Sequence, residues 1–148
     1  MIILASSSQA RKNLLEKAKI DFAAIPSNFD ENSIIDEDLI SLVKRLSFLK
    51  AKVVMEECIS SDKYFDLKGK IKGFLGCDSM FIINGISYGK PKNKDEAFKR
   101  WEIMSSNKGM LFTGHSLILN VGNKDHVFLD DIRLGLRQKV IGTEIIFE

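Results

Sequence analysis

The beginning of the chain places a strand, a serine-rich turn and a helix in direct succession, which favours a fold that mixes strands with helices. The apolar run 1–4 precedes three consecutive serines, and a helical pattern follows them. A helix start presents free backbone N–H groups and the positive end of its dipole to the preceding turn, so this order suits a bound phosphate. Ser6 and Ser8 add hydroxyl donors, and Arg11 adds a positive charge. The alternative is that Ser8 only caps the helix.

Composition excludes several classes of protein. The 148 residues suit one domain, residues 1–148, and the net charge of +2 with dispersed Lys and Arg argues against a nucleic-acid partner. Two cysteines without paired spacing argue against a zinc site or a disulfide framework and indicate a reducing compartment. No signal peptide and no run of membrane-spanning length is visible. We therefore expect a cytoplasmic protein that does not enter a membrane.

Helical and strand patterns alternate along the chain. The spacing of apolar residues predicts helices at 9–19, 36–58 and 94–104, with a charged surface loop at 60–72. Strands are predicted at 1–4, 22–26, 74–77, 80–83, 86–88, 110–121, 126–129 and 140–147. Asn84 and Gly85 form a two-residue hairpin signal, and Trp101 is expected to pack its helix on the sheet. The pattern predicts an α/β fold in which helices flank a mixed β-sheet.

Two acidic positions stand out. Asp78 is expected where a buried strand meets a turn, and ligands of open α/β sheets gather beyond the ends of strands. A carboxylate there can hold Mg²⁺ or orient water, or it can simply form the turn. Glu31, beside Asp30, lies in a polar loop after another strand, and its alternative interpretation is a solvated loop acid.

Two lysines complete the set of candidates. Lys50 follows the apolar stripe of the 36–58 helix by one position, where most lysines extend along the surface into solvent. Lys90 lies between Gly89 and Pro91, so a stiff turn presents its ammonium group. His115 and His126 have no evident Ser or Cys partner, which makes a nucleophilic dyad improbable.

The acids and cations are informative in combination. Acids that hold a divalent metal, with cations and a helix start around it, suit a polyphosphate ligand. The glycine-rich motifs of common nucleotide-binding folds and the zinc-protease motif are absent. The combination therefore predicts a site for a phosphorylated small molecule.

At these positions the sequence resembles the Maf family of nucleoside triphosphate pyrophosphatases, also described as septum formation inhibitors. The family motifs occur here in order and across essentially the whole chain. They are Ala-Ser-x-Ser at residues 5–8 with Arg11, Asp30-Glu31, Leu-x-x-x-Lys-Ala at residues 46–51, Gly76-Cys77-Asp78-Ser79, Gly89-Lys90-Pro91, Glu96-Ala97 and Thr113-Gly114.

The resemblance implies a Maf/inosine-triphosphatase-like fold and a Mg²⁺-dependent enzyme that cuts nucleoside triphosphates between the α and β phosphates. It implies that Asp78 and Glu31 bind the metal and act in catalysis with Lys50 and Lys90. Ser6, Ser8 and Arg11 would bind the phosphates. The nucleobase preference is left open.

Two departures from the family pattern generate further expectations. Ala10 stands where the family has an arginine, so one phosphate-binding charge is absent. Family members normally continue past a strand that resembles residues 143–147, so we expect the chain to lack the family's C-terminal segment. Such a form would pair with a second copy through this strand or be marginally stable. The alternative function is a nucleotide-binding regulator of cell division with weak catalysis.

Overall fold

The described strands form one mixed sheet. The computed structural model describes residues 1–31, 34, 38–89, 91–120 and 134–147. Its strands are β1 (Ile2–Leu4), β2 (Phe22–Ala24), β3 (Gly73–Ile83), β4 (Ile86–Tyr88), β5 (Lys108–Asn120) and β6 (Leu134–Ile146). They lie in the order β2-β1-β3-β5-β6, with β4 also paired to β3. The β1–β2 and β1–β3 pairs are parallel and the others are antiparallel. The predicted α/β class with a mixed sheet is confirmed.

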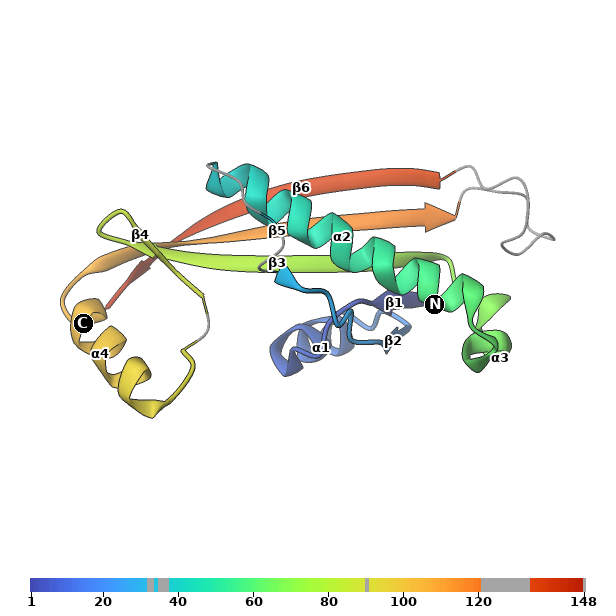
Figure 1. The fold of residues 1–148 in the computed structure, drawn as a ribbon, viewed down its shortest axis with the longest axis horizontal. Coiled ribbons are helices and arrows are strands. Elements are labelled where there is room, and N and C mark those ends of the chain that lie inside the picture. The colour runs from blue at the N-terminus through green and yellow to red at the C-terminus, as the bar shows by residue number, and fades with distance from the viewer. Residues whose placement is uncertain (32–33, 35–37, 90, 121–133, 148) are drawn as a thin grey trace.

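The helices are distributed along the length of this sheet (Figure 1). They are α1 (Gln9–Lys17), α2 (Leu39–Ser60), α3 (Phe65–Lys68) and α4 (Lys94–Met104). A 3₁₀ turn (Asp62–Tyr64) joins α2 to α3, so the segment predicted as a surface loop is partly helical. Its Tyr64 is buried against the core, which explains why the segment is ordered. The strand predicted at 126–129 lies outside the described residues.

Strand β3 is longer than the sequence predicts. Two short strands with a turn at Asp78 were expected, but β5 pairs with β3 at every position from Gly73 to Ile83. That prediction is wrong because the continuous β5 ladder holds Asp78 and Ser79 inside the strand. On its other edge β3 pairs with β1 up to Leu75 and with β4 only from Phe81. Among the described residues no strand pairs with this edge at 76–80, which leaves a gap in the sheet.

Helix α2 lies in backbone contact with the sheet (Figure 1). A methyl group added at Gly76 on β3 would lie 1.9 Å from the Ser47 carbonyl oxygen, and one added at Gly114 on β5 would lie 2.3 Å from that of Val43. Glycine is therefore needed at both positions. The buried side of α2 comprises Val43, Leu46, Ser47, Lys50, Ala51, Val54, Met55 and Cys58. This side includes Lys50, which the apolar stripe alone excluded.

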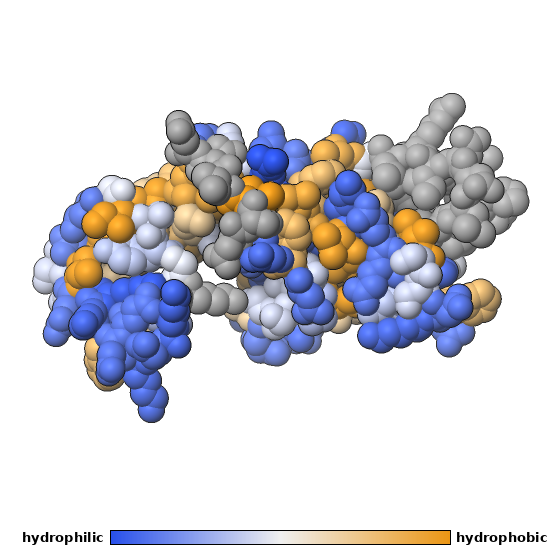
Figure 2. Space-filling view, viewed as in Figure 1, coloured by the Kyte–Doolittle hydropathy of each residue, from blue (hydrophilic) through white to orange (hydrophobic). Residues whose placement is uncertain are grey.

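The hydrophobic core lies between α2 and the β1–β3–β5 part of the sheet. Phe74 and Ile3, which are paired neighbours on β3 and β1, are fully buried with Val54 of α2. Figure 2 shows hydrophobic residues gathered in a band along the line where α2 meets the strands. Burying a side chain of this size contributes about 1.5–3 kcal/mol, so this region dominates the stability of the fold. None of the described helices is both long and apolar enough to cross a bilayer.

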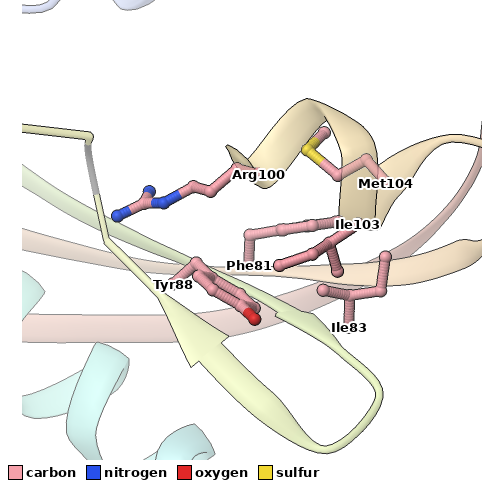
Figure 3. Close-up of a pocket in the computed structure, with 6 residues that line it drawn as sticks. All are labelled: Phe81, Ile83, Tyr88, Arg100, Ile103 and Met104. Atoms are coloured by element: carbon pink, nitrogen blue, oxygen red, sulfur yellow. The ribbon is translucent and has the colours of Figure 1, made fainter. Parts of the chain in front are cut away.

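Helix α4 lies at the far end of the sheet, beside the β3–β4 hairpin (Figure 1). The predicted hairpin is confirmed, since Asn84 and Gly85 both adopt positive φ, at 51° and 75°, as its tight turn requires. The predicted packing of Trp101 on the sheet is wrong, because that side chain is 72% exposed. The helix instead contacts the hairpin through Ile103 and Met104 around a space of about 10 Å³ (Figure 3). Such a space is too small for a ligand.

Candidate active site

Three charged side chains converge where α2 crosses β3. The Lys50 ammonium group lies 2.5 Å from Oδ1 of Asp78 and 2.7 Å from Oε1 of Glu31. Lys50 reaches Asp78 because Gly76, two residues earlier on the same face of β3, lets α2 approach the strand. Glu31 approaches from the loop that follows β2. The structure thus joins three of the residues predicted from the sequence into one cluster.

Burial strengthens the attraction between the charges of this cluster. The side chains of Lys50 and Asp78 are 10% and 8% exposed, whereas Glu31 is 55% exposed. A buried charge is costly unless it is paired, and each of these two charges is compensated by the other. The alternative interpretation, in which Lys50 extends into solvent, is wrong. The predicted solvated state of Glu31 is only partly right, since one of its oxygens contacts the ammonium group.

The cluster has the donor chemistry of a magnesium site. Asp78 and Glu31 each present a carboxylate oxygen toward the same point, now held by the Lys50 ammonium group. Among the described residues no group of three or more His, Cys, Asp or Glu side chains could hold a metal ion. Mg²⁺ is commonly bound by one or two carboxylates together with substrate phosphates, so two acids fit this ion.

Arg11 lies on the opposite face of β3. Its guanidinium group donates from Nη1 to Oγ of Ser6 and from Nη2 to Oγ of Ser79, each over 3.1 Å. Ser79 in turn shares a 2.9 Å hydrogen bond with Thr113 on β5. Successive residues of a strand point to opposite faces, so Asp78 and Ser79 aim at different sides of the sheet at the gap.

Ser8 occupies the N-cap position of α1, but its side chain makes no capping hydrogen bond. The Ser6 hydroxyl accepts the Ser8 N–H over 3.2 Å instead, which forms a compact serine turn. The capping interpretation of Ser8 is therefore wrong. Ser6 is buried and connected to Arg11, while Ser8 is partly exposed at the start of the helix.

Lys90 lies outside the described residues, so its predicted role stays a prediction. Its neighbour Gly89 accepts a hydrogen bond through its carbonyl oxygen from Arg100 of α4, which also pairs with Glu96. The Arg100 guanidinium group lies 5.3 Å from the centre of the Tyr88 ring (Figure 3). The contacts with Gly89 and Tyr88 attach the end of β4 to α4.

A buried hydroxyl network beneath the cluster was missed from the sequence. Ser47 of α2 and Ser116 of β5 are fully buried, and their hydroxyl oxygens lie 2.7 Å apart. The Gln138 amide on β6 donates to Ser116 over 2.8 Å. The network links α2 to both strands one helical turn before Lys50. In the sequence, the only signal was that Ser47 interrupts the apolar stripe of α2 between Leu46 and Phe48.

Two further polar side chains lie near Arg11. Burial raises the pKa of the Cys77 thiol above its ordinary value, so the thiol is protonated and inert at neutral pH. Burial, and then the nearby Arg11 guanidinium group, lower the pKa of His115. This imidazole is therefore neutral at pH 7. His126 lies outside the described residues.

Comparison with known proteins is consistent with this arrangement. The family model described as Maf-like protein matches residues 1–138. The chain is 49% identical over 121 residues to a protein of Prochlorococcus marinus (strain MIT 9215) named nucleoside triphosphate pyrophosphatase, which covers 80% of this chain and 58% of that protein. A protein of the same name from Microcystis aeruginosa is 44% identical over 123 residues, which is 83% of this chain and 57% of that protein. The chain thus spans little more than half the length of these curated relatives.

Among solved structures, the Staphylococcus aureus Ham1 protein aligns with 97% of this chain and 71% of its own, at a TM-score of 0.47 and 13% identity. An alignment at that score supports no statement about chemistry. The family is shown by the match over residues 1–138. The motifs around Ser6, Lys50 and Asp78 occur in the family's order. The chain belongs to the Maf family.

Proposed function

We propose that the protein hydrolyses nucleoside triphosphates between the α and β phosphates and releases a nucleoside monophosphate and pyrophosphate. The observation that carries this proposal is the Lys50–Asp78–Glu31 cluster at the gap in the sheet, with Arg11 on the other side of β3. Carboxylates and cations held at one place suit the displacement of one phosphate group from another. The names of the similar cyanobacterial proteins support the same reaction.

Asp78 is the residue we assign to water activation. Its Oδ1 atom is held by Lys50, and among the described residues no donor contacts Oδ2. That second oxygen can take the proton of a water molecule as the water attacks phosphorus, while the ammonium group holds the carboxylate in its orientation. The proton of the water goes to Oδ2, and the bond to pyrophosphate breaks.

Glu31 and Asp78 are the residues that would hold Mg²⁺, and the metal dependence is part of the proposal. When bound, Mg²⁺ supplies positive charge against the phosphate oxygens. Glu31 is the more exposed acid, so it can leave Lys50 and turn toward the ion without uncovering a buried charge. Lys50 then balances the charge that develops during transfer.

Ser6, Ser8, Arg11 and the N–H groups at the start of α1 are assigned to the substrate phosphates. Figure 2 shows the lobe of α4 standing apart from the lobe of α1. For Lys90, which lies outside the described residues, the proposed role is a second phosphate contact.

The direct experiment is a pyrophosphate-release assay over a panel of standard and modified nucleoside triphosphates, with Mg²⁺ and with a chelator. We expect that pyrophosphate release requires Mg²⁺ and that its rate differs between nucleobases. Triphosphate binding without release would support the alternative, a nucleotide-binding regulator of cell division. Release of orthophosphate alone would contradict the proposed reaction.

Location and assembly stay proposals. The two cysteines are buried and unpaired, which supports a reducing compartment such as the cytoplasm. A homodimer remains a prediction, and sedimentation of the purified protein would test it. The proposed reaction needs no nucleic-acid partner.

A further inference from the structure

The hydroxyl pair on the Arg11 face has no assigned role in the reaction proposed above. Ser79 and Thr113 face each other on β3 and β5, and the Ser79 hydroxyl also receives a hydrogen bond from Arg11. Ser79 is exposed and Thr113 is partly buried, so only the serine presents its hydroxyl group openly. The pair lies at the level of the gap, where none of the described strands pairs with one edge of β3.

Counting hydrogen-bond capacity shows what Ser79 can offer. A serine hydroxyl has one proton to donate and two lone pairs that accept. The Arg11 N–H occupies one lone pair, and the Thr113 hydroxyl can donate to the other. In that arrangement the proton of Ser79 is free to donate to a ligand. Thr113 therefore orients the Ser79 hydroxyl group and leaves its proton for a ligand.

The charge of Arg11 is available to such a ligand. Within the part of the chain that the structure describes, the ion pairs include no acid bound to Arg11. Its guanidinium group is held only by the neutral hydroxyls of Ser6 and Ser79. An oriented arginine without a counter-ion, flanked by hydroxyl donors, suits a phosphate oxygen.

We propose that Ser79 and Arg11 form a subsite for the phosphates of the leaving pyrophosphate, and that Thr113 is a positioning residue that keeps the Ser79 proton free for them. The inference rests on the proposed function and divides its site in two. The reacting phosphate lies on the Asp78 face, and the distal phosphates pass the open edge of β3 to the Arg11 face. Neighbouring residues of one strand thereby contact neighbouring groups of one ligand.

Calorimetric titration with inorganic pyrophosphate, and separately with a nucleoside monophosphate, tests this division without turnover. Both are measured with Mg²⁺ present. Ser79→Ala should weaken pyrophosphate binding about tenfold or more, as expected for a lost hydrogen bond to a charged group. Monophosphate binding should change by less than about twofold, because that product lies on the other face.

Three variants separate positioning from folding. Thr113→Val should weaken pyrophosphate binding by a smaller factor, about threefold to fivefold, because Arg11 still contacts Ser79. Thr113→Ser keeps the hydroxyl and should restore wild-type binding. Thr143→Val, an exposed position on β6, is the matched control and should leave both ligands unaffected.

The outcomes distinguish this inference from the proposed function. One outcome is a protein that binds pyrophosphate in a way that depends on Ser79 and yet releases none from triphosphates. That result would support the proposed subsite and contradict the proposed reaction. Turnover of triphosphates with pyrophosphate binding unchanged in Ser79→Ala would overturn the subsite. So would equal weakening of both ligands, or a wild-type protein that does not bind pyrophosphate.

Discussion

Helices α2 and α4 both carry apolar residues at helical spacing, but only α2 buries them. Eight side chains of α2 are buried, including Lys50, whereas none of α4 is. The difference lies in the strands beneath them, because Gly76 and Gly114 allow backbone contact under α2. Under α4 the groove beside β6, about 590 Å³ in volume, is lined by Trp101 and Phe147 and stays open. Small residues in the partner strand therefore decide which amphipathic helix is drawn into the core.

The comparison has a functional consequence. A buried lysine and aspartate need a rigid environment that excludes water, and the α2 region supplies it. Arg100 attaches the α4 region to the end of β4, because it donates to the Gly89 carbonyl oxygen and lies 5.3 Å from the centre of the Tyr88 ring. The Lys50 and Asp78 charges, which must keep their positions, thus lie in the α2 region.

Asp78→Asn should have the largest effect on activity. The change removes the base and one charge at the cluster while it conserves shape, so turnover should fall by about a thousandfold or more. Stability should fall by less than the roughly 3–5 kcal/mol typical of a broken buried pair, since Lys50 keeps Glu31. Kinetics and thermal unfolding check this, with the exposed Asp66→Asn as control. Retained turnover would remove Asp78 from the mechanism.

Lys50→Met should slow turnover by about a hundredfold, because a cation beside the transferring phosphate is lost while the packing of the stem is kept. Lys52→Met, half-exposed on the same helix and 3.7 Å from Glu56, is the matched control. A large drop in melting temperature with unchanged kinetics would show that Lys50 is only structural.

Gly76→Ala should lower the free energy of unfolding by about 1–3 kcal/mol or more, because the new methyl group meets the α2 backbone. Gly69→Ala, which has open space around its added methyl group, should change it far less. Urea denaturation of both variants measures the contrast. If the two variants were equally stable, close backbone contact would not be what distinguishes α2 from α4.

Trp101→Ala should have the smallest effect. The side chain is 72% exposed, so the free energy of unfolding should change by less than about 0.5 kcal/mol. The same denaturation experiment applies. A loss of several kcal/mol would show that the α4 face is covered in solution.

The patterns that are local in sequence predicted local structure well. The bounds of α4 at Lys94–Met104 and the Asn84-Gly85 turn were both correct, since spacing and positive φ are properties of the segment itself. The class of fold followed from the alternation of strands and helices. The family motifs named Lys50, Asp78 and Glu31 together, and the structure confirms that they meet.

The predictions that failed concern features that depend on contacts between residues far apart in the sequence. The burial of Lys50 follows from the glycines in β3 and β5, and the continuity of β3 through Asp78 follows from its ladder with β5. The exposure of Trp101 goes with a helix that, among the described residues, buries none of its side chains. None of these is a property of a single segment, so periodicity could not reveal them.

The most direct test of the account is phosphorus NMR of the products formed from a nucleoside triphosphate with Mg²⁺, in parallel for the wild-type protein and Asp78→Asn. The account predicts that the wild type forms nucleoside monophosphate and pyrophosphate in equal amounts and that the variant forms neither at a comparable rate. Formation of nucleoside diphosphate and orthophosphate, or pyrophosphate formation that Asp78→Asn leaves unchanged, would contradict it.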